Sequence, residues 1–255
     1  MAAHDTRPPR IAFIGYGEAA RAFLAGWRSE PGFAATVTAF DVKTDGPDAI
    51  RAGKFADYAA DGVEPAATAH EAVAGATLVV SVVTADQAHA AALSVVGALA
   101  PGALFLDCNS CAPQMKVKSA EKIDAAGGAY VDVAVMAPVH PRLHRTPLLI
   151  SGPNAEAAAP VLAGLGMAAE IQAGPVGASS SIKMVRSIMI KGIEALVCEC
   201  VLAGRLAGVD DIVLATLDDT FPGFDWEKRS AYMLERVMTH GIRRAAELRE
   251  VALTV

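Results

Sequence analysis

The chain has 255 residues, of which 53% are hydrophobic and 20% are charged, and its formal net charge is −6. This length suffices for one large domain or two smaller ones. The acidic balance argues against non-specific nucleic-acid binding, which requires a broad cationic face, and an aromatic content of 5% argues against stacking platforms for single strands.

The N-terminal segment, MAAHDTRPPR, contains an acidic residue and two prolines, and it lacks the pattern of a signal peptide. The longest apolar run, residues 90–106, is interrupted by Pro101 and Gly102. This run therefore predicts a helix, a turn and a strand rather than a membrane span. We expect a cytoplasmic protein.

Short β-branched runs alternate with alanine-rich helical stretches over the first two thirds of the chain. The predicted strands cover residues 11–14, 37–40, 78–83, 104–107, 130–135, 148–151 and 170–172. The clearest helical patterns between them cover residues 19–29, 85–99 and 115–126. This alternation is typical of βαβ units, and it predicts an α/β fold with a Rossmann-type, doubly wound, mostly parallel sheet covered on both faces.

The pattern changes after residue 177. Helical patterns cover residues 182–208, 210–217 and 226–251, and no strong strand pattern follows. We therefore predict a dinucleotide-binding domain in residues 1–176 and a smaller all-helical domain in residues 177–255, which includes a long interdomain helix.

The first predicted strand runs into the sequence GYGEAA, residues 15–20, at the start of the first helix. Gly15 permits a tight turn, Gly17 allows the backbone to approach a pyrophosphate, and Ala20 lets the helix pack on the strand. The N–H groups at the helix N-terminus, around Tyr16, Glu18 and Ala19, favour a bound phosphate. Small residues at such a corner also arise from packing alone, so the context has to decide.

That context is a second strand that ends in Asp41, about 20 residues beyond the glycines. A carboxylate at this position accepts hydrogen bonds from the ribose hydroxyls of the adenosine, and it repels the 2′-phosphate of NADP. Lys43 lies near enough to neutralise that phosphate, so NADP stays open as the alternative. We expect a dinucleotide site that favours NAD.

Four cysteines form two close pairs, Cys108 with Cys111 and Cys198 with Cys200. On a helix, Cys198 and Cys200 point about 200° apart, which argues against a zinc site built from all four. We expect thiols that are mostly buried, in a reducing compartment, and no metal site.

Three later segments resemble the β-hydroxyacid dehydrogenase superfamily, which contains 6-phosphogluconate and 3-hydroxyisobutyrate dehydrogenases. These segments are LDCNSCAP (106–113), YVDVAVMAPV (130–139) and GASSSIKMVRS (177–187). They are similar to the loop that borders the nicotinamide ribose, to the substrate loop, and to the start of the interdomain helix with its catalytic lysine. The C-terminal segments, including HGIRRAAELREVA, resemble a poorly characterised branch with its own short helical domain.

The resemblance implies that Lys183 is the general acid/base. Its place just inside a helix N-terminus suits this role, because the helix dipole disfavours the cation and lowers the lysine pKa. The resemblance also extends the cofactor site from the Gly15–Ala20 turn and Asp41 to Val83, Thr84, Asn109 and Ser110. Without these motifs, Lys183 would be read as a surface lysine on an amphipathic helix.

The substrate loop departs from the superfamily pattern. Met136 replaces the usual serine, Ala137 and Pro138 replace glycines, and Ser187 replaces an asparagine one turn after the lysine. The usual serine and backbone contacts to a carboxylate are therefore lost, and the substrate cannot be transferred from the superfamily.

Two groups of residues could compensate. His140, Arg142, His144 and Arg145 follow the substrate loop and form either an anion-binding cluster or a solvated basic loop. Ser187 and Lys191 share a helix face with Lys183 and are candidate substrate contacts, together with Met136 and Ala137. The helix that carries His240, Arg243 and Arg244 is expected to be mainly structural, through i,i+4 pairing. In relatives, the tail of a partner subunit can approach the substrate site, so a substrate contact by these residues stays open as the alternative.

The sequence thus predicts an NAD(P)-dependent oxidoreductase that acts on a small acidic substrate, a β-hydroxy acid, and relatives imply a homodimer. An imine reductase is the second enzyme hypothesis, although such relatives usually lack the lysine. The third is a dinucleotide-binding accessory protein that has lost dehydrogenase activity.

Overall fold

The computed structural model describes residues 9–254. The segment that was judged not to be a signal peptide lies almost entirely outside these residues. The chain divides into two compact units, one that ends at Lys183 and one that begins at Met184. The predicted boundary falls in the loop before a long helix, whereas the division lies inside that helix. Each unit is described by itself.

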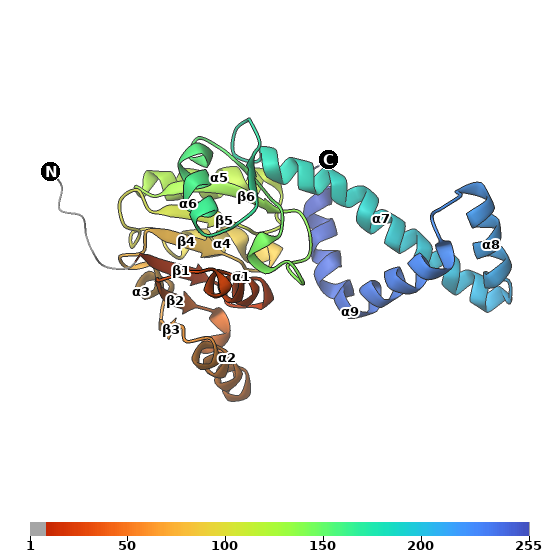
Figure 1. Ribbon diagram of the computed structural model, residues 1–255, viewed down its shortest axis with the longest axis horizontal. Helices are drawn as coiled ribbons and strands as arrows, with labels where there is room; N and C mark the ends of the chain where they lie inside the picture. Colours follow the sequence, from red (N-terminus) through yellow and green to blue (C-terminus); the bar gives the residue numbers. More distant parts are fainter. Residues whose placement is uncertain (1–8, 255) are drawn as a thin grey trace. The chain divides into compact units, whose positions relative to one another are not determined.

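The first unit contains an eight-stranded sheet with the strand order β3-β2-β1-β4-β5-β6-β7-β8 (Figure 1). All neighbouring pairs are parallel except β6 and β7. The bounds are β1 Arg10–Ile14, β2 Thr36–Phe40, β3 Glu64–Pro65, β4 Leu78–Ser81, β5 Leu104–Asp107, β6 Ala129–Val135, β7 Leu148–Ser151 and β8 Ala169–Ile171. The predicted doubly wound, mostly parallel sheet is confirmed.

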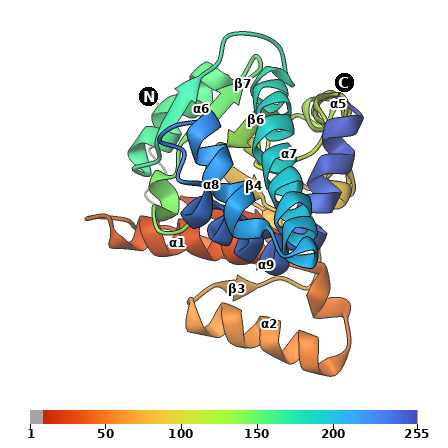
Figure 2. The same cartoon turned by 90° about the vertical axis from the view of Figure 1, so that its right-hand side faces the viewer.

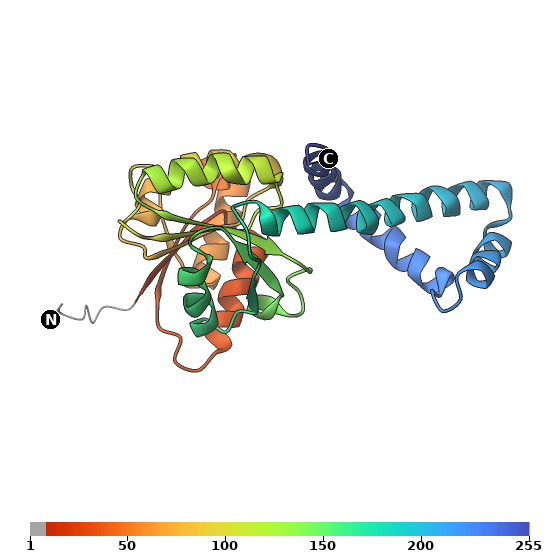
Figure 3. The same ribbon diagram turned by 90° about the horizontal axis from the view of Figure 1, so that it is seen from above.

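Helices cover both faces of this sheet, as Figure 3 shows most clearly. Their bounds are α1 Glu18–Ser29, α2 Asp48–Ala60, α3 Ala69–Val73, α4 Ala88–Leu93, α5 Pro113–Ala125 and α6 Ala155–Gly164. Ile11 and Phe13 of β1 face a core formed with α1, α2 and α6, while Ala12 and Ile14 face a second core formed with α3, α4 and α5. Because both faces of the strand are buried, its sequence is apolar throughout.

Several elements differ from the sequence prediction. The edge strand β3 and the helices α2, α3 and α6 were not predicted; α2 lies beside β3 at the sheet edge in Figure 2. The helix α2 buries only Lys54 and Tyr58, so its apolar periodicity is weak. The predicted helix 85–99 is a short 3₁₀ turn followed by α4, which ends where the Ser94 hydroxyl donates to the Ala91 carbonyl oxygen.

The second unit is helical in its described residues. It contains α8 (Asp210–Thr220), α9 (Trp226–Ala252) and the part of α7 (Ala178–Ala207) that begins at Met184. The bounds of the three helices agree with the predicted ones to within a few residues. Its buried apolar side chains within the described residues are Met184, Val197 and Val251. None of the helices in residues 9–254 combines the length and the apolar content that crossing a bilayer demands.

Candidate dinucleotide and catalytic site

The candidate site lies at the carboxyl ends of the parallel strands. The strand order reverses between β1 and β4, and this switch point is where doubly wound sheets bind their ligands. Loops that follow β1, β2, β4 and β5 meet there, and hydrogen bonds join them.

Gly15 is required by the fold itself. Its φ angle is +83°, its N–H donates to the Phe40 carbonyl oxygen at 2.8 Å, and an added Cβ would lie 2.7 Å from the Val82 carbonyl oxygen. A side chain at this position would therefore strain the backbone and collide with the loop after β4.

Gly17 has no such structural reason. A Cβ built on it meets no atom within 4 Å, and its φ angle is −100°. The N-terminus of α1 begins at the next residue, Glu18, and has no side-chain cap. The free N–H groups at this uncapped helix N-terminus suit the pyrophosphate of a dinucleotide, and Gly17 leaves room for it. Ala19 is half-buried, and Ala20 is buried against the core as predicted.

Tyr16 and Asp41 hold each other in place. The Tyr16 N–H donates to Asp41 Oδ2 at 2.8 Å, and the Lys43 N–H donates to Asp41 Oδ1 at 2.9 Å. A carboxylate can accept about four hydrogen bonds, so capacity remains for the ribose hydroxyls. The Tyr16 ring packs against Phe13 and Tyr58, and burial raises its pKa. Tyr16 thus fixes Asp41 rather than offering its N–H to a phosphate.

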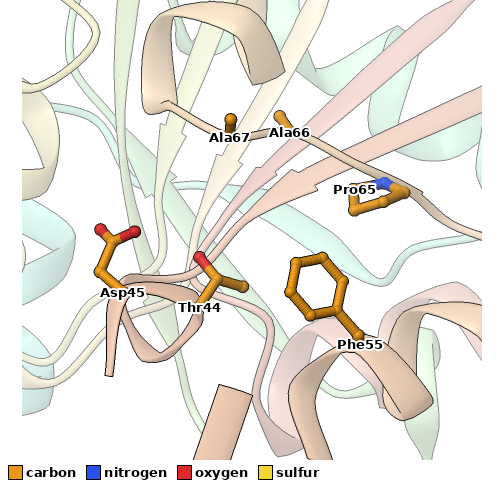
Figure 4. Close-up of a pocket in the computed structure, with 6 residues that line it drawn as sticks. All are labelled: Thr44, Asp45, Phe55, Pro65, Ala66 and Ala67. Atoms are coloured by element: carbon orange, nitrogen blue, oxygen red, sulfur yellow. The ribbon is translucent and has the colours of Figure 1, made fainter. Parts of the chain in front are cut away.

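A hollow of about 260 Å³ lies next to Asp41, whose backbone carbonyl oxygen accepts a 2.7 Å hydrogen bond from the Thr44 hydroxyl. Figure 4 shows Thr44 and Phe55 on one side of it and Pro65 across from them. The lining residues are Thr44, Asp45, Phe55, Pro65, Ala66 and Ala67. The apolar members of this lining, next to the carboxylate that is predicted to bind the ribose, suit an adenine ring. Sequence reasoning missed this hollow because β3 and α2, which contribute to it, were not predicted.

Asn109 connects the ends of β4 and β5. Its Oδ1 accepts a hydrogen bond from the Val83 N–H at 2.6 Å, and its Nδ2 donates to Ser81 and Asp107. The predicted cofactor residue Asn109 therefore shapes the loop after β4, where Thr84 is exposed.

Lys183 and Ser110 meet directly. The Lys183 Nζ donates to the Ser110 Oγ at 2.5 Å, and both side chains are half-buried. This contact joins α7 to the loop after β5 within the first unit. It brings the predicted proton-transfer group to the loop that was expected to border the nicotinamide ribose.

A buried polar network lies beneath this contact. Asp107, Lys116 and Asp132 are all fully buried, and Lys116 Nζ lies 2.9 Å from Asp107 and 3.6 Å from Asp132. Burial alone lowers the pKa of Lys116, but Asp107 and Asp132 outweigh this effect and raise the pKa. The Tyr130 hydroxyl donates to Asp107 Oδ2 at 2.6 Å. Sequence reasoning missed this network, although a charged residue inside the apolar run YVDVAV was a usable signal.

Glu30 pairs with two of the four residues of the basic loop after β6. His144 is buried and lies 2.8 Å from Glu30, and Arg145 lies 2.6 Å from the same carboxylate. Glu30 follows α1, so these two residues tie the loop to that helix, and a Cβ at Gly26 would collide with the His144 ring. His140 and Arg142 are exposed, and their contact with an anionic substrate stays a prediction.

The other predicted substrate residues are divided between the two units. Met136 and Ala137 are half-buried and follow β6. Ser187 and Lys191 belong to the second unit, where both are buried and Lys191 Nζ lies 2.9 Å from Glu247. The Lys191 charge is therefore neutralised by a carboxylate within its own unit.

The helix α9 forms ion pairs in that unit, which fits its predicted structural role. Arg243 pairs with Glu247 at 3.0 Å with i,i+4 spacing, as expected. Arg244 instead pairs with Glu194 of α7, which also contacts Arg236 at 3.1 Å. His240 is half-buried.

The cysteines of the first unit are more deeply buried than those of the second. Cys108 and Cys111 are buried, and Cys198 and Cys200 are half-buried. Burial raises the pKa of the Cys108 thiol to about 12, so this thiol stays protonated at neutral pH. No cluster of metal-ligating side chains occurs within residues 9–254.

The fold and the glycine turn define a dinucleotide-binding protein of the Rossmann class. Residues 10–174, more than half of the chain, match the NAD binding domain of 6-phosphogluconate dehydrogenase. Residues 205–255 match a domain of unknown function, DUF1932. The chain therefore belongs to the β-hydroxyacid dehydrogenase superfamily, as the sequence motifs predicted.

Solved structures agree with this assignment. A conserved hypothetical protein from Sinorhizobium meliloti 1021 is 38% identical, with 98% of this chain and 82% of that chain covered and a TM-score of 0.73. A conserved protein of unknown function with structural similarity to 3-hydroxyacid dehydrogenases is 26% identical (96% and 88% covered, TM-score 0.71). No match was found among curated protein sequences.

More distant structures share the fold alone. A 3-hydroxyisobutyrate dehydrogenase from Salmonella typhimurium is 18% identical, with 96% and 86% of the two chains covered and a TM-score of 0.70. An imine reductase from Myxococcus stipitatus, in complex with NADP+, is 21% identical (92% and 78% covered, TM-score 0.65).

Proposed function

We propose that the protein is an NAD(P)-dependent oxidoreductase that interconverts a hydroxyl and a carbonyl group in a small hydroxy acid, with Lys183 as the general acid/base. The observation that carries the proposal is the 2.5 Å contact between Lys183 and Ser110 at the end of β5. This contact brings an amine to the loops that would hold the cofactor.

Each part of the site has a separate task in this proposal. The open turn at Gly17 and the N-terminus of α1 would hold the pyrophosphate, Asp41 the adenosine ribose, and the hollow beside Phe55 the adenine. The bound nicotinamide supplies the hydride acceptor and donor. Lys183 takes the proton from the substrate hydroxyl during oxidation and returns it to the carbonyl oxygen during reduction.

Lys183→Met is the direct test. We expect turnover of a panel of small 3-hydroxy acids to fall about 10²- to 10⁴-fold, because a positioned acid/base contributes that much, while the Kd for NAD stays within about twofold. Lys118→Met is the control, since Lys118 is an exposed lysine of α5 in the same unit. Equal turnover in the wild type and in Lys183→Met would overturn the assignment of Lys183.

Asp41 supports a preference for NAD over NADP. Its carboxylate is 9% exposed and fixed by two backbone N–H groups, so it cannot turn away from a 2′-phosphate without breaking both hydrogen bonds. Calorimetric titration should give a lower Kd for NAD than for NADP, and Asp41→Ala should weaken NAD binding. Equal affinity for NAD in both proteins would remove Asp41 from the ribose site.

Two alternatives make different predictions. An imine reductase would reduce a cyclic imine with NADPH and leave every hydroxy acid untouched; the presence of Lys183 argues against it. An accessory protein would bind the dinucleotide tightly and turn over neither class of substrate, and the altered loop at Met136 and Ala137 favours that outcome over the imine reductase.

We also propose a homodimer formed through the second unit. Leu206, Met238 and Ile242 are 92%, 86% and 94% exposed, which is unusual for apolar side chains on a stable surface. Light scattering after size exclusion should show a dimer for the wild type and a monomer for Ile242→Glu. A monomeric wild type at micromolar concentration would reject the dimer. The cytoplasmic location stays a prediction.

A further inference from the structure

The N-terminus of α7 is capped by side chains from the sheet. Asp132 of β6 accepts hydrogen bonds from the Gly177 N–H at 3.0 Å, from the Ser180 N–H at 3.1 Å and from the Ser180 hydroxyl at 2.6 Å. Ser151 of β7 accepts the Ser179 N–H at 3.0 Å and donates to Asp132 at 3.1 Å. The first N–H groups of this helix are thus satisfied by two neighbouring strands rather than by the helix itself.

The same carboxylate is linked to the loop that receives Lys183. Lys116 Nζ contacts Asp132 and Asp107, and it also donates to the Asp107 carbonyl oxygen at 2.6 Å. Asp107 Oδ1 accepts the Asn109 N–H at 3.1 Å, and Asn109 precedes Ser110 in the chain. The contacts therefore form a closed circuit from Ser110 through Asp107, Lys116 and Asp132 to α7, and back through the Lys183 amine.

We propose that Asp132 is a positioning residue that fixes the first turn of α7 and thereby holds the amine of Lys183 at Ser110. The inference rests on the proposed function in that Lys183 is the proton-transfer group there. Lys116 lowers the cost of keeping the Asp132 carboxylate charged, because its ammonium lies 3.6 Å from that carboxylate while it pairs with Asp107 at 2.9 Å.

Helix geometry explains why the effect reaches Lys183. Ser180 and Lys183 are three residues apart, less than one helical turn, so they share one face and move as one rigid turn. A half-buried lysine has four rotatable bonds, and a shift of about 1 Å in its Cα suffices to separate Nζ from Ser110. A cap at the start of α7 therefore controls a contact that is made from the second turn of the helix.

A purely structural cap would behave differently. It would change the free energy of unfolding and leave the local reactivity of Lys183 in the folded protein unaltered. The exposure of the amine in the ligand-free native protein is therefore the decisive measurement, and it does not depend on any catalytic activity.

The test is Asp132→Asn, which keeps the side-chain volume but removes one charge and one strong acceptor. The rate of Lys183 acetylation by an N-hydroxysuccinimide ester is followed by mass spectrometry at fixed pH, with exposed Lys118 as the internal reference. We expect an increase of about tenfold, the effect of releasing one hydrogen bond. Ser180→Ala removes only the 2.6 Å hydroxyl contact and should give a smaller increase.

Thr68→Ala is the matched control, since Thr68 caps the helix α3 of the same unit by accepting the Glu71 N–H at 3.1 Å. Its Lys183 rate should equal that of the wild type. An unchanged Lys183 rate in a folded Asp132→Asn protein would overturn the proposal. Should that variant fail to fold, Ser180→Ala decides by the same criterion.

Activity separates the two proposals. If hydroxy acids are substrates, Asp132→Asn should lower kcat about tenfold and leave the Kd for NAD within about twofold. If the wild type turns over no hydroxy acid, the proposed function fails, and the labelling result still tests the positioning. If Lys183→Met abolishes turnover while Asp132→Asn leaves the Lys183 acetylation rate unchanged, only the positioning fails.

Discussion

Different interactions stabilise the interior of each of the two units. The first unit has two apolar cores, one on each face of its sheet, and aromatic rings such as Phe13, Phe23 and Trp27 stack within one of them. The second unit buries few apolar side chains among its described residues and exposes many large ones. Ion pairs of Glu194 and Lys191 join its helices α7 and α9.

This difference affects the rigidity and the stability of the two units. Dispersion and the hydrophobic effect give the first unit a rigid frame, on which a proton-transfer group can be held to within a fraction of an ångström. Ion pairs contribute less net stability, because desolvation offsets most of their attraction. The second unit therefore depends on covering its apolar surface, and we expect its stability to rise with protein concentration.

The largest expected effect comes from a pair of phenylalanines, each of which lies beside a tryptophan. Phe23 is fully buried, and its ring centroid lies 6.3 Å from that of Trp27. Phe221 is 55% exposed, and its ring centroid lies 6.0 Å from that of Trp226. Phe23→Ala should lower the free energy of unfolding of the first unit by about 3–5 kcal/mol. Phe221→Ala should cost less than about 1 kcal/mol. Urea titrations followed by tryptophan fluorescence measure both, and equal losses would contradict the contrast between the units.

A smaller effect is expected from the ionic network of the second unit. Glu194→Gln removes the charge that faces Arg236 and Arg244, and burial already lowers the pKa of Arg244. We expect a loss of about 2–4 kcal/mol, since a buried cation is left without its counter-charge. Unfolding is followed by Trp226 fluorescence in a Trp27→Phe background, with exposed Glu235→Gln as the control. No loss relative to that control would show that the network does not hold the unit together.

The smallest effect is a dependence of the first unit's stability on acid pH. A hydrogen bond from Lys54 lowers the pKa of Asp57, and hydrogen bonds from Arg145 and then His144 lower the pKa of Glu30. Each carboxyl contributes stability that is complete above its unfolded pKa of about 4 and is lost as pH falls through its lower folded pKa. The stability difference between wild type and Asp57→Asn should thus shrink between about pH 5 and pH 3. If this difference in the free energy of unfolding, measured by Trp27 fluorescence, stays constant with pH, Asp57 makes no such contribution.

The sequence by itself determined the features that depend on short-range chemistry. The period of apolar residues located the central strands, Gly15 marked the turn because its positive φ angle requires glycine, and Asp41 and Lys183 lay at fixed distances from strand and helix ends. The superfamily assignment followed from such local motifs.

Only the tertiary structure decided which charges remain available. His144 and Arg145 looked like an anion site until Glu30, more than a hundred residues earlier, was found between them, and Lys191 pairs with Glu247. Asp132 looked like an interruption in a strand, yet it caps α7 across the sheet. Pairing between buried charges depends on which distant segments the cores bring together, and no local pattern encodes that.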